Sequence, residues 1–280
     1  MSNEEPLIFH LQVARKKPEN IKHPEGYCPF CDRENLTNIL DKDGDCIWLV
    51  NKFRTLQDTM QTIIIESKDH LGDQSSYSQL ENRKIIKYAL ECWQKMINQN
   101  KYKSVLLYKN FGPRSGGSLR HPHFQIVGLD KKDGYANISS KNFQGVDVVS
   151  KNNVQLNISR YPLKGFVEFN VQMSQDGDVA TFADYIQSTV KFILSDDFYH
   201  GHYDSYNLFF YNIDQKIECK IMPRYVASPY FIGYQISQVN NEESLMQIAE
   251  ALQKRILAEQ VIKWVKELPS FQMCMGIRLH

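Results

Sequence analysis

The sequence lacks any apolar run that approaches the roughly 20 residues of a membrane span. It also lacks an excess of charge of one sign, since 33 lysines and arginines stand against 32 aspartates and glutamates. A net charge near zero argues against nucleic acid or an anionic membrane as the main partner. The N-terminus, MSNEEPLIFHLQVARKK, does not place a basic segment before an apolar one, as a secretory signal would. We therefore expect a cytoplasmic protein with neither a nucleic-acid nor a membrane partner.

Cysteine is also sparse, with six in 280 residues and one closely spaced pair. This usage fits reduced thiols better than a disulfide framework. Low-complexity segments and short-period repeats are missing too. The length suffices for one large or two ordinary domains with a sizeable core.

What is present is a strand–helix–strand order in both halves of the chain. In the first half, the capping box of Ser78 and Glu81 predicts the start of a helix. Polar residues with glycine and serine indicate a connector over Asp130–Asn152. Together the patterns favour two related α+β units. The expected strands are Cys46–Val50, Met60–Glu66, Lys103–Lys109, His123–Leu129, Asn153–Ser159, Gly165–Met173, Tyr206–Asn212, Lys216–Met222 and Tyr230–Ile236, and the expected helices are Gln79–Asn98, Phe182–Leu194 (with Thr181 as N-cap) and Ser244–Leu268 (with Leu245, Ile248, Leu252 and Ile256 on one stripe).

A CxxC motif, Cys28-Pro29-Phe30-Cys31, could supply two thiolates to a tetrahedral zinc ion. The same motif is also compatible with a redox pair or with two buried cysteines that have no function. Because the sequence has no second CxxC, the two missing ligands would have to be histidines. His70 closes the segment TIIIESKDH, which contains one predicted strand, and His121 precedes another strand. A Cys28–Cys31–His70–His121 site would therefore join three distant segments. The alternative for His70 is a surface turn residue.

The stretch His121-Pro122-His123-Phe124-Gln125 sets two imidazoles two residues apart, so that in a strand both would lie on one face. An unprotonated imidazole can attack phosphorus, and His123 is the candidate nucleophile. Gln125, on the same face, can donate a hydrogen bond to a phosphate but cannot protonate a leaving group, which favours transfer over hydrolysis. For an HxH pattern in isolation, a metal pair or chance would be the favoured interpretation. Upstream lies a loop suited to phosphate, with Gly112, Arg114, Gly116, Gly117 and Arg120.

Three further features have weaker signals. Ser118 could reach the leaving phosphate or merely cap a turn. Asn51 and Lys52 follow a strand and could line a base pocket, although polar strand ends are common. His200 and His202 could bind metal, but a solvated loop is the favoured interpretation.

Taken together, these motifs resemble the galactose-1-phosphate uridylyltransferase family, the transferase branch of the histidine-triad superfamily. The resemblance implies an α+β fold with duplicated histidine-triad-like halves, whose antiparallel sheets are flanked by helices. Residues 1–145 would hold the zinc site and the nucleophile, and residues 146–280 would recognise the acceptor or sugar. The family is often dimeric, so a homodimer is an expected assembly. The matching pieces are GYCPFC (26–31), WLVNKFRTL (48–56), IIIESKDH (63–70), LENRKIIKYALECWQ (80–94), LLYKNFGPRSGGSLRHPHFQ (106–125) and YFIGYQI (230–236).

The resemblance also implies roles for single residues. His123 matches the nucleophile, and Gln125 and Ser118 match residues that contact the phosphates. Asn110 matches the phosphate-loop asparagine, while Asn51 and Lys52 lie where the family holds the nucleoside. The implied structural zinc ligands are Cys28, Cys31, His70 and His121, and the implied acceptor contacts are Tyr234 and Gln235.

Departures from the family pattern concern the acceptor. Some members hold a second metal through C-terminal histidines, where this chain has Tyr211, Glu218 and Lys220, so we expect that site to be absent. Gln235 stands where the family usually has glutamate, Pro229 replaces a basic residue, and Leu119-Arg120 replaces Asn-Pro. These changes question galactose 1-phosphate as the acceptor.

The sequence thus predicts a nucleotidyltransferase. It would move a nucleoside monophosphate from a nucleotide sugar or dinucleotide, through a nucleotidyl-histidine, to a phosphorylated small-molecule acceptor. A phosphorylase using inorganic phosphate, and a zinc-stabilised nucleotide-binding protein without catalysis, are the alternatives.

Overall fold

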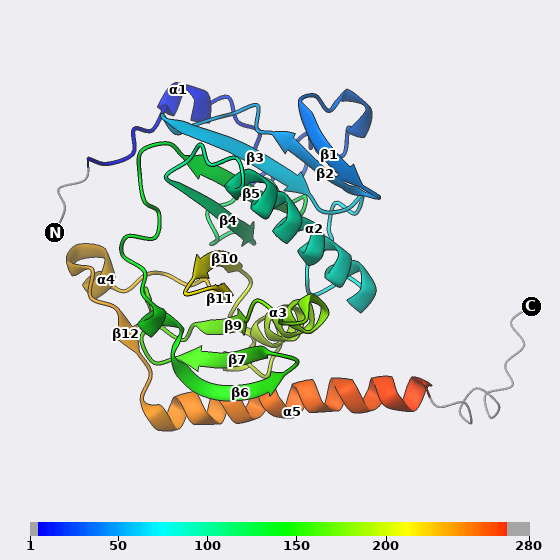
Figure 1. Ribbon diagram of the computed structural model, residues 1–280, viewed down its shortest axis with the longest axis vertical. Helices are drawn as coiled ribbons and strands as arrows, with labels where there is room; N and C mark the ends of the chain where they lie inside the picture. The colour runs from blue at the N-terminus through cyan, green and yellow to red at the C-terminus, as the bar shows by residue number, and fades with distance from the viewer. Residues whose placement is uncertain (1–4, 268–280) are drawn as a thin grey trace, which may run out of the picture.

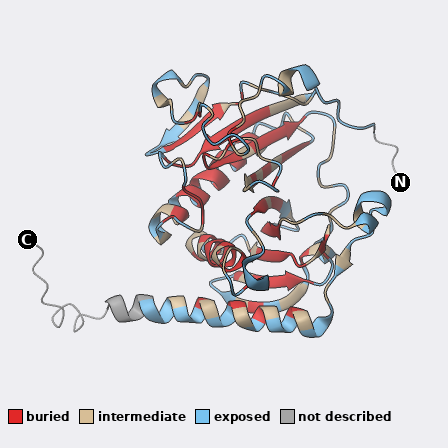
Figure 2. Cartoon of the chain, turned by 180° about the vertical axis from the view of Figure 1, so that it is seen from behind, coloured by how far each residue is buried: buried red, intermediate tan, exposed pale blue. Residues whose placement is uncertain are grey.

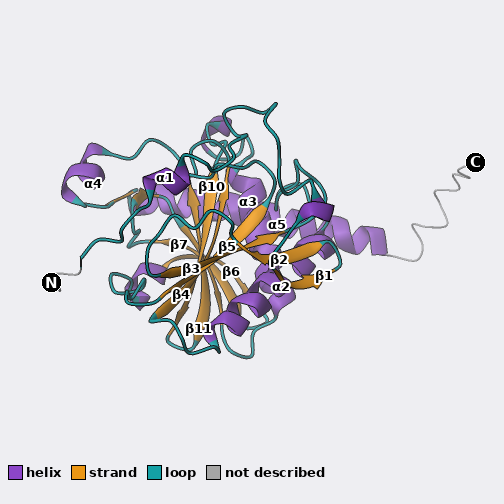
Figure 3. Cartoon of the chain, turned by 90° about the horizontal axis from the view of Figure 1, so that it is seen from above, coloured by secondary structure: helices purple, strands orange, loops and turns teal. Residues whose placement is uncertain are grey.

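One twisted antiparallel sheet of ten strands organises the molecule, as the computed structural model describes it for residues 5–267, with side chains through residue 262. Its strand order is β1-β2-β3-β5-β4-β10-β11-β9-β7-β6. The view along the sheet in Figure 3 shows how far the strands rotate from one edge to the other. The strands are β1 (Ile39–Asp43), β2 (Cys46–Val50), β3 (Thr59–Ile65), β4 (Ser104–Phe111), β5 (His123–Leu129), β6 (Gly145–Lys151), β7 (Val154–Ser159), β9 (Phe169–Met173), β10 (Tyr206–Ile213) and β11 (Lys216–Pro223).

The two halves of the sheet have the same connectivity. The first half is ordered first, second, third, fifth, fourth strand, and the second half has the same order read from its own edge. The halves meet where β4 pairs with β10, with Lys109 opposite Leu208. In each half a helix follows the third strand: α2 (Gln79–Ile97) after β3 and α3 (Val179–Ile193) after β9. The predicted fold, duplicated α+β halves with antiparallel sheets, is confirmed. The expected boundary at 145/146 falls at the first residue of β6.

Helices α2 and α3, together with α5 (Glu242–Glu267), cover one face of the sheet (Figure 1). Buried side chains of these helices and of the strands form one core cluster, and Figure 2 colours the corresponding stretches of helix and strand as buried. Ser78 caps α2 as predicted, because its side chain accepts from the Glu81 amide at 3.2 Å. Helix α3 starts earlier than predicted, because Asp178 rather than Thr181 is its N-cap. Leu268, the predicted end of α5, lies outside the described residues.

Two predicted elements are wrong. The connector Asp130–Asn152 contains strand β6, which pairs along its whole length with β7. The predicted strand Tyr230–Ile236 is instead helix α4 (Pro229–Tyr234), because Ser228 caps the Tyr230 amide and Pro229 suits a first helical turn.

Smaller differences concern short elements. The predicted strand Gly165–Met173 is divided into β8 (Gly165–Phe166) and β9, and β8 pairs with β12 (Gln238–Val239). Helix α1 (Leu11–Ala14) and strand β1 were not predicted. Strand β1 lies at the edge of the sheet with a half-exposed, polar sequence, so it lacks the apolar signal of a core strand.

The face of the sheet opposite the helices carries the candidate site residues His123 and Gln125. On β5, Phe124 and Ile126 join the core beneath α2, so alternation turns His123 and Gln125 to the other face. Within residues 5–267, no helix combines the length and apolarity needed to cross a lipid bilayer.

Candidate active site and metal centre

Four predicted metal ligands come together. The ligand atoms of Cys28, Cys31, His70 and His121 all lie within 4.8 Å of one another. The Cys31 Sγ is 3.2 Å from His70 Nδ1 and 3.4 Å from His121 Nδ1. A tetrahedral ion with metal–sulfur and metal–nitrogen bonds of about 2.3 and 2.0 Å would separate S and N ligands by about 3.5 Å. The donor set therefore fits a tetrahedral metal ion.

The tautomer of His121 suits this role. Its Nε2 lies 3.0 Å from the Ser67 carbonyl, an acceptor that places the proton on Nε2 and leaves the Nδ1 lone pair for a metal. Arg120, next to His121, stabilises the same region, because its guanidinium donates to the carbonyl of Leu71 at 2.7 Å and of Gly72 at 3.3 Å. The loop before His121 is thus tied to the turn after His70.

His123 is held by its neighbour. Its Nδ1 lies 2.8 Å from the backbone carbonyl of His121, which fixes the proton on Nδ1 and leaves Nε2 with the lone pair. The pKa of His123 is lowered to about 4, mainly by burial and also by the Lys109 and Lys17 ammonium groups, against the opposing hydrogen bond to His121. The imidazole is therefore neutral near pH 7, as a nucleophile requires.

His123 lies in a cavity of about 460 Å³. Apolar side chains from the CxxC loop, β2, β3 and the loop before β5 form much of its wall. Ser118, Gln125, Asn51 and Lys52 line it as well, as predicted for phosphate and nucleoside contacts. The apolar part consists of Pro18, Pro29, Phe30, Leu36, Leu49, Val50, Phe53, Ile63 and Leu119.

Hydrogen bonds orient the amides in this cavity. The Tyr108 hydroxyl donates to Gln125 Oε1 at 3.0 Å, which leaves the Gln125 NH₂ group as the end available to an anion. Asn51 Oδ1 accepts from the Phe53 amide at 2.8 Å, so its NH₂ end is likewise available. Both side chains are thereby set to donate.

Several predicted site residues do not line the cavity. Arg114 pairs with Asp204, and Arg120 contacts carbonyls and the Phe111 ring. Asn110 accepts from Asn207 at 2.6 Å, in the sheet beside the loop. Gly116 and Gly117 belong to that loop, and the predicted acceptor contacts Tyr234 and Gln235 are exposed at the end of α4.

Gly112 anchors the loop. Its φ is +83°, and a Cβ there would lie 2.2 Å from the Asp204 carbonyl oxygen. Only glycine permits this approach between the two halves.

Sequence reasoning missed two lysines of the cavity. Lys16 and Lys17 line it from the segment after α1, and Lys17 lies close enough to His123 to depress its pKa. The basic run Arg15-Lys16-Lys17 before Pro18 was the available signal, but nothing in the sequence places it opposite a strand more than one hundred residues away.

A buried ion pair behind the site was also missed. Lys109 Nζ lies 2.5 and 2.6 Å from the two carboxylate oxygens of Glu66, and both side chains are fully buried. The Glu66 amide also donates to the Pro122 carbonyl at 3.2 Å. The pair therefore supports the strand ends that carry the HPH segment.

In the second half, Lys220 occupies the centre of a buried polar cluster. Its Nζ lies 3.1 Å from Glu168 and 2.8 Å from Asn170 Oδ1. Glu218 and Tyr211, the other residues at the expected position of a second metal site, are cross-strand neighbours on β11 and β10. The Lys220 ammonium group therefore lies at the position where some family members would hold a second metal ion.

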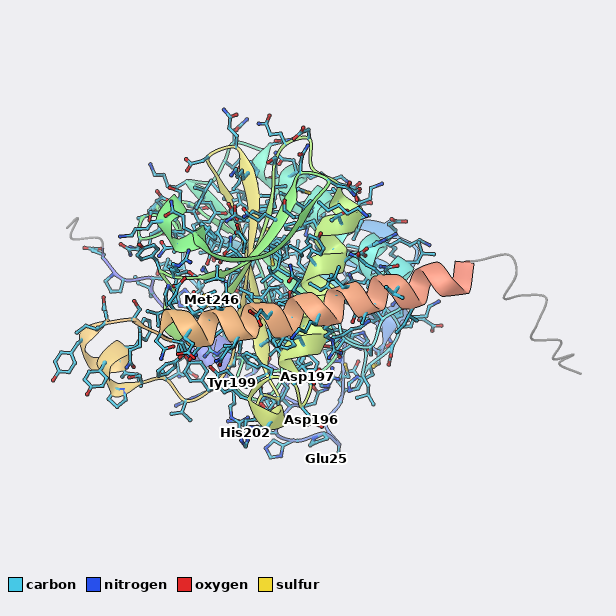
Figure 4. All side chains as sticks on the ribbon, turned by 90° about the horizontal axis from the view of Figure 1, so that it is seen from below. Glu25, Asp196, Asp197, Tyr199, His202 and Met246 are labelled. Carbon is cyan, nitrogen blue, oxygen red and sulfur yellow. The ribbon has the colours of Figure 1, made fainter. Side chains whose placement is uncertain are left out.

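The HGH motif belongs to an exposed loop. His200 and His202 lie within or next to a 3-10 turn, and His202 lies at the edge of the molecule (Figure 4). Neither histidine belongs to a group of three metal-ligating side chains among the described residues.

Comparisons with known proteins agree with this architecture. The N-terminal and C-terminal domains of DUF4931, a domain of unknown function, match residues 9–132 and 135–256. A crystal structure of a DUF4931 family protein from Bacillus cereus is 43% identical, covering 75% of this chain and 97% of that one, with a TM-score of 0.68. A uridylyltransferase structure is 18% identical, with 83% and 93% covered and a TM-score of 0.64. An ADP-glucose phosphorylase from Arabidopsis thaliana is 12% identical, with 81% and 89% covered and a TM-score of 0.63.

A curated relative, Protein APA1 of Saccharomyces cerevisiae, is 28% identical over 132 residues. The match covers 45% of this chain and 39% of that protein, so the chain spans well under half of its length.

The chain therefore falls in the class of proteins that share the fold of the uridylyltransferase and ADP-glucose phosphorylase structures. Within that class, the chain belongs to the DUF4931 family.

Proposed function

We propose that the protein is a nucleotidyltransferase that works through a covalent nucleotidyl-histidine on His123. The observation that carries the proposal is the hydrogen bond from His123 Nδ1 to the His121 carbonyl, which leaves Nε2 unprotonated inside the cavity. In the first step Nε2 attacks the α-phosphorus of the donor, and the bond from phosphorus to the bridging oxygen breaks. In the second step a phosphate oxygen of the acceptor attacks the same phosphorus and releases Nε2.

The neighbouring groups support charge on phosphorus without acting as acids. Gln125 presents its NH₂ end, since Tyr108 occupies the carbonyl oxygen, and an amide cannot protonate the leaving oxygen. Lys17 supplies positive charge next to His123. This set favours a phosphate leaving group and a phosphate acceptor over hydrolysis.

The metal in this proposal is a structural Zn²⁺ held by Cys28, Cys31, His70 and His121. It would fix the HPH segment, since the carbonyl that orients His123 belongs to a ligand. Cytoplasmic location and assembly as a homodimer stay predictions, as do the acceptor contacts of Tyr234 and Gln235.

A phosphorylase is the second candidate, with inorganic phosphate as the acceptor. One observation favours it: Tyr234 is 75% exposed, and neither it nor Gln235 lines the cavity that contains His123. A small acceptor needs no such sugar contacts. In this view the phosphate meets the covalent intermediate beside Gln125 and Ser118.

The test is covalent labelling with donors that carry ³²P at the α-phosphate. We expect an acid-labile label on the wild-type protein and on His202→Gln, which changes an exposed histidine outside the site. His123→Gln should lose the label and at least a thousandfold in turnover. Chasing the labelled protein with hexose 1-phosphate or with inorganic phosphate then separates transferase from phosphorylase.

Binding of every donor without label would support the non-catalytic alternative. Full turnover by His123→Gln would refute the mechanism outright. Elemental analysis tests the metal: we expect close to one zinc per chain, and a marked loss in Cys31→Ser.

A further inference from the structure

Positive charge in the cavity is not balanced by the protein. Lys16, Lys17 and Lys52 line it, and none of the three forms an ion pair with a carboxylate in the described part of the chain. Asp32 is the one lining carboxylate, and it accepts from Tyr27 at 2.8 Å and from an asparagine amide at 2.9 Å. Three ammonium groups against one carboxylate leave a surplus of two positive charges, whereas the whole chain carries +1.

The surplus is placed unevenly along the cavity. Lys17 lies near His123 and Lys16 precedes it, so two ammonium groups border the end where the phosphorus would be attacked. Lys52 follows Asn51, whose amide bonds to Gln61. Gln61 is four residues along β3 from Ile65, which lies opposite His123. The backbone of Asn51 and Lys52 is therefore about 13 Å from that of the nucleophile, measured along the strands. Lys16 and Lys17 therefore flank the donor beyond the transferred nucleotide, while Lys52 flanks the nucleoside.

Both arginines predicted to bind phosphate are engaged elsewhere, Arg114 with Asp204 and Arg120 with backbone carbonyls. The charge offered to the leaving part is therefore ammonium, a point charge that suits a flexible phosphate chain and does not require the fixed geometry of a guanidinium fork. Two adjacent lysines also offer little to the several hydroxyls of a hexose, which need acceptors as well as donors.

We propose that the leaving part of the donor is a phosphate chain rather than a sugar phosphate, so that the donor carries three or more phosphates. This inference rests on the proposed function and names its donor class. Nucleoside triphosphates and dinucleoside polyphosphates share that chemistry. With the nucleoside monophosphate in the cavity, the extra phosphates pass Lys17 and Lys16, where their charge meets the surplus.

The experiment compares rates of covalent labelling for donors matched in base: diadenosine tetraphosphate and ATP against ADP-glucose, and the uridine equivalents against UDP-glucose. For the preferred base we expect the polyphosphate donor to react at least tenfold faster at low concentration. Lys16→Met should reduce that preference about fivefold while changing the sugar donor less than twofold. Lys52→Met should affect both donors alike, and Lys101→Met, an exposed site outside the cavity, should affect neither. The preference should also shrink between 50 and 500 mM KCl, because salt screens the exposed charge of Lys16.

Equal or faster labelling by the nucleotide sugar would overturn this inference and leave the nucleotidyl-histidine intact. A preference that Lys16→Met does not change would overturn the assignment to these lysines. Label from neither donor class would instead overturn the proposed function itself. A comparison of ATP with diadenosine tetraphosphate then shows whether the phosphate chain of the preferred donor ends in a second nucleoside.

Discussion

Removing the Lys109 ammonium should destabilise the protein in a way that depends on pH. In Lys109→Met the fully buried Glu66 carboxylate keeps only uncharged side-chain partners, Gln74 Nε2 at 3.2 Å and the Tyr77 hydroxyl. Burial already raises the pKa of Glu66, and Lys109 is the largest influence opposing that rise. Without Lys109 the carboxyl group therefore stays protonated in the folded state at neutral pH, as an uncompensated buried charge would cost more.

The magnitude follows from the cost of protonation. In the unfolded chain the carboxyl ionises above its ordinary pKa of 4.5, so keeping it neutral at pH 7 costs about 3 kcal/mol, and at pH 5 about 1 kcal/mol. Stability should therefore fall as pH rises, and the gap from wild type should widen by about 2 kcal/mol between pH 5 and 7. Against a total of about 5–15 kcal/mol, this loss is readily measured.

The assay is urea unfolding followed by circular dichroism at pH 5, 6 and 7, with wild type measured at each pH to cancel effects on the metal ligands. The control is Lys109→Met combined with Glu66→Gln, which has no carboxyl group to neutralise and should recover most of the pH 7 loss. Asp73 also acts on Glu66, but it is common to all variants. A gap that is the same at pH 5 and 7, or below 1 kcal/mol at pH 7, would refute the reasoning.

Three other changes are expected to have measurable effects. Glu218 is buried with Oε2 unpaired among the described residues, and burial raises its pKa to about 8 against the opposing effect of Lys216 and Lys220. In urea unfolding, Glu218→Gln should therefore stabilise the fold above pH 8 by a few kcal/mol and change little at pH 4. Tyr108→Phe frees the carbonyl end of Gln125 and should slow labelling of His123 about tenfold with little change in KM, whereas a larger effect on KM would contradict an orienting role. Asp178→Ala removes the cap of α3 and should cost about 1–2 kcal/mol in the same unfolding assay without affecting the labelling rate.

The sequence revealed the parts of the site whose chemistry is local. The CxxC spacing predicts metal ligands and the HPH pair predicts a nucleophile, because each motif depends on residues within a single turn or a single strand. His70 could be added because the strand before it has a strong apolar signal. In the structure these ligands do meet, and His121 joins the metal group to His123 through its carbonyl.

The parts that could not be predicted depend on contacts between distant segments. Lys17 reaches His123 from the N-terminal segment, and Arg120 was assigned to phosphate because its sequence neighbours suit an anion. Its actual partners, the carbonyls of Leu71 and Gly72, follow from the path of a loop about fifty residues earlier. The segment at Tyr230 shows the same limit at the level of secondary structure: its aromatic residues suit a strand, but the Ser228 cap makes a helix.

The duplicated fold gives a physical reason for placing the proposed chemistry in one half. Strand β11 is the counterpart of β5, being the last strand of its half and adjacent to the third. On the site face, β5 offers a neutral imidazole and an amide to an open cavity, whereas β11 offers Glu218 and Lys220. The three N–H groups of the Lys220 ammonium have partners in Glu168, Asn170 and the Asn142 carbonyl, so none is left to bind a ligand. The same backbone therefore forms the proposed reaction surface in one half and a closed polar core in the other. The second half contributes by fixing β4 against β10, beside the loop that carries Ser118 toward His123.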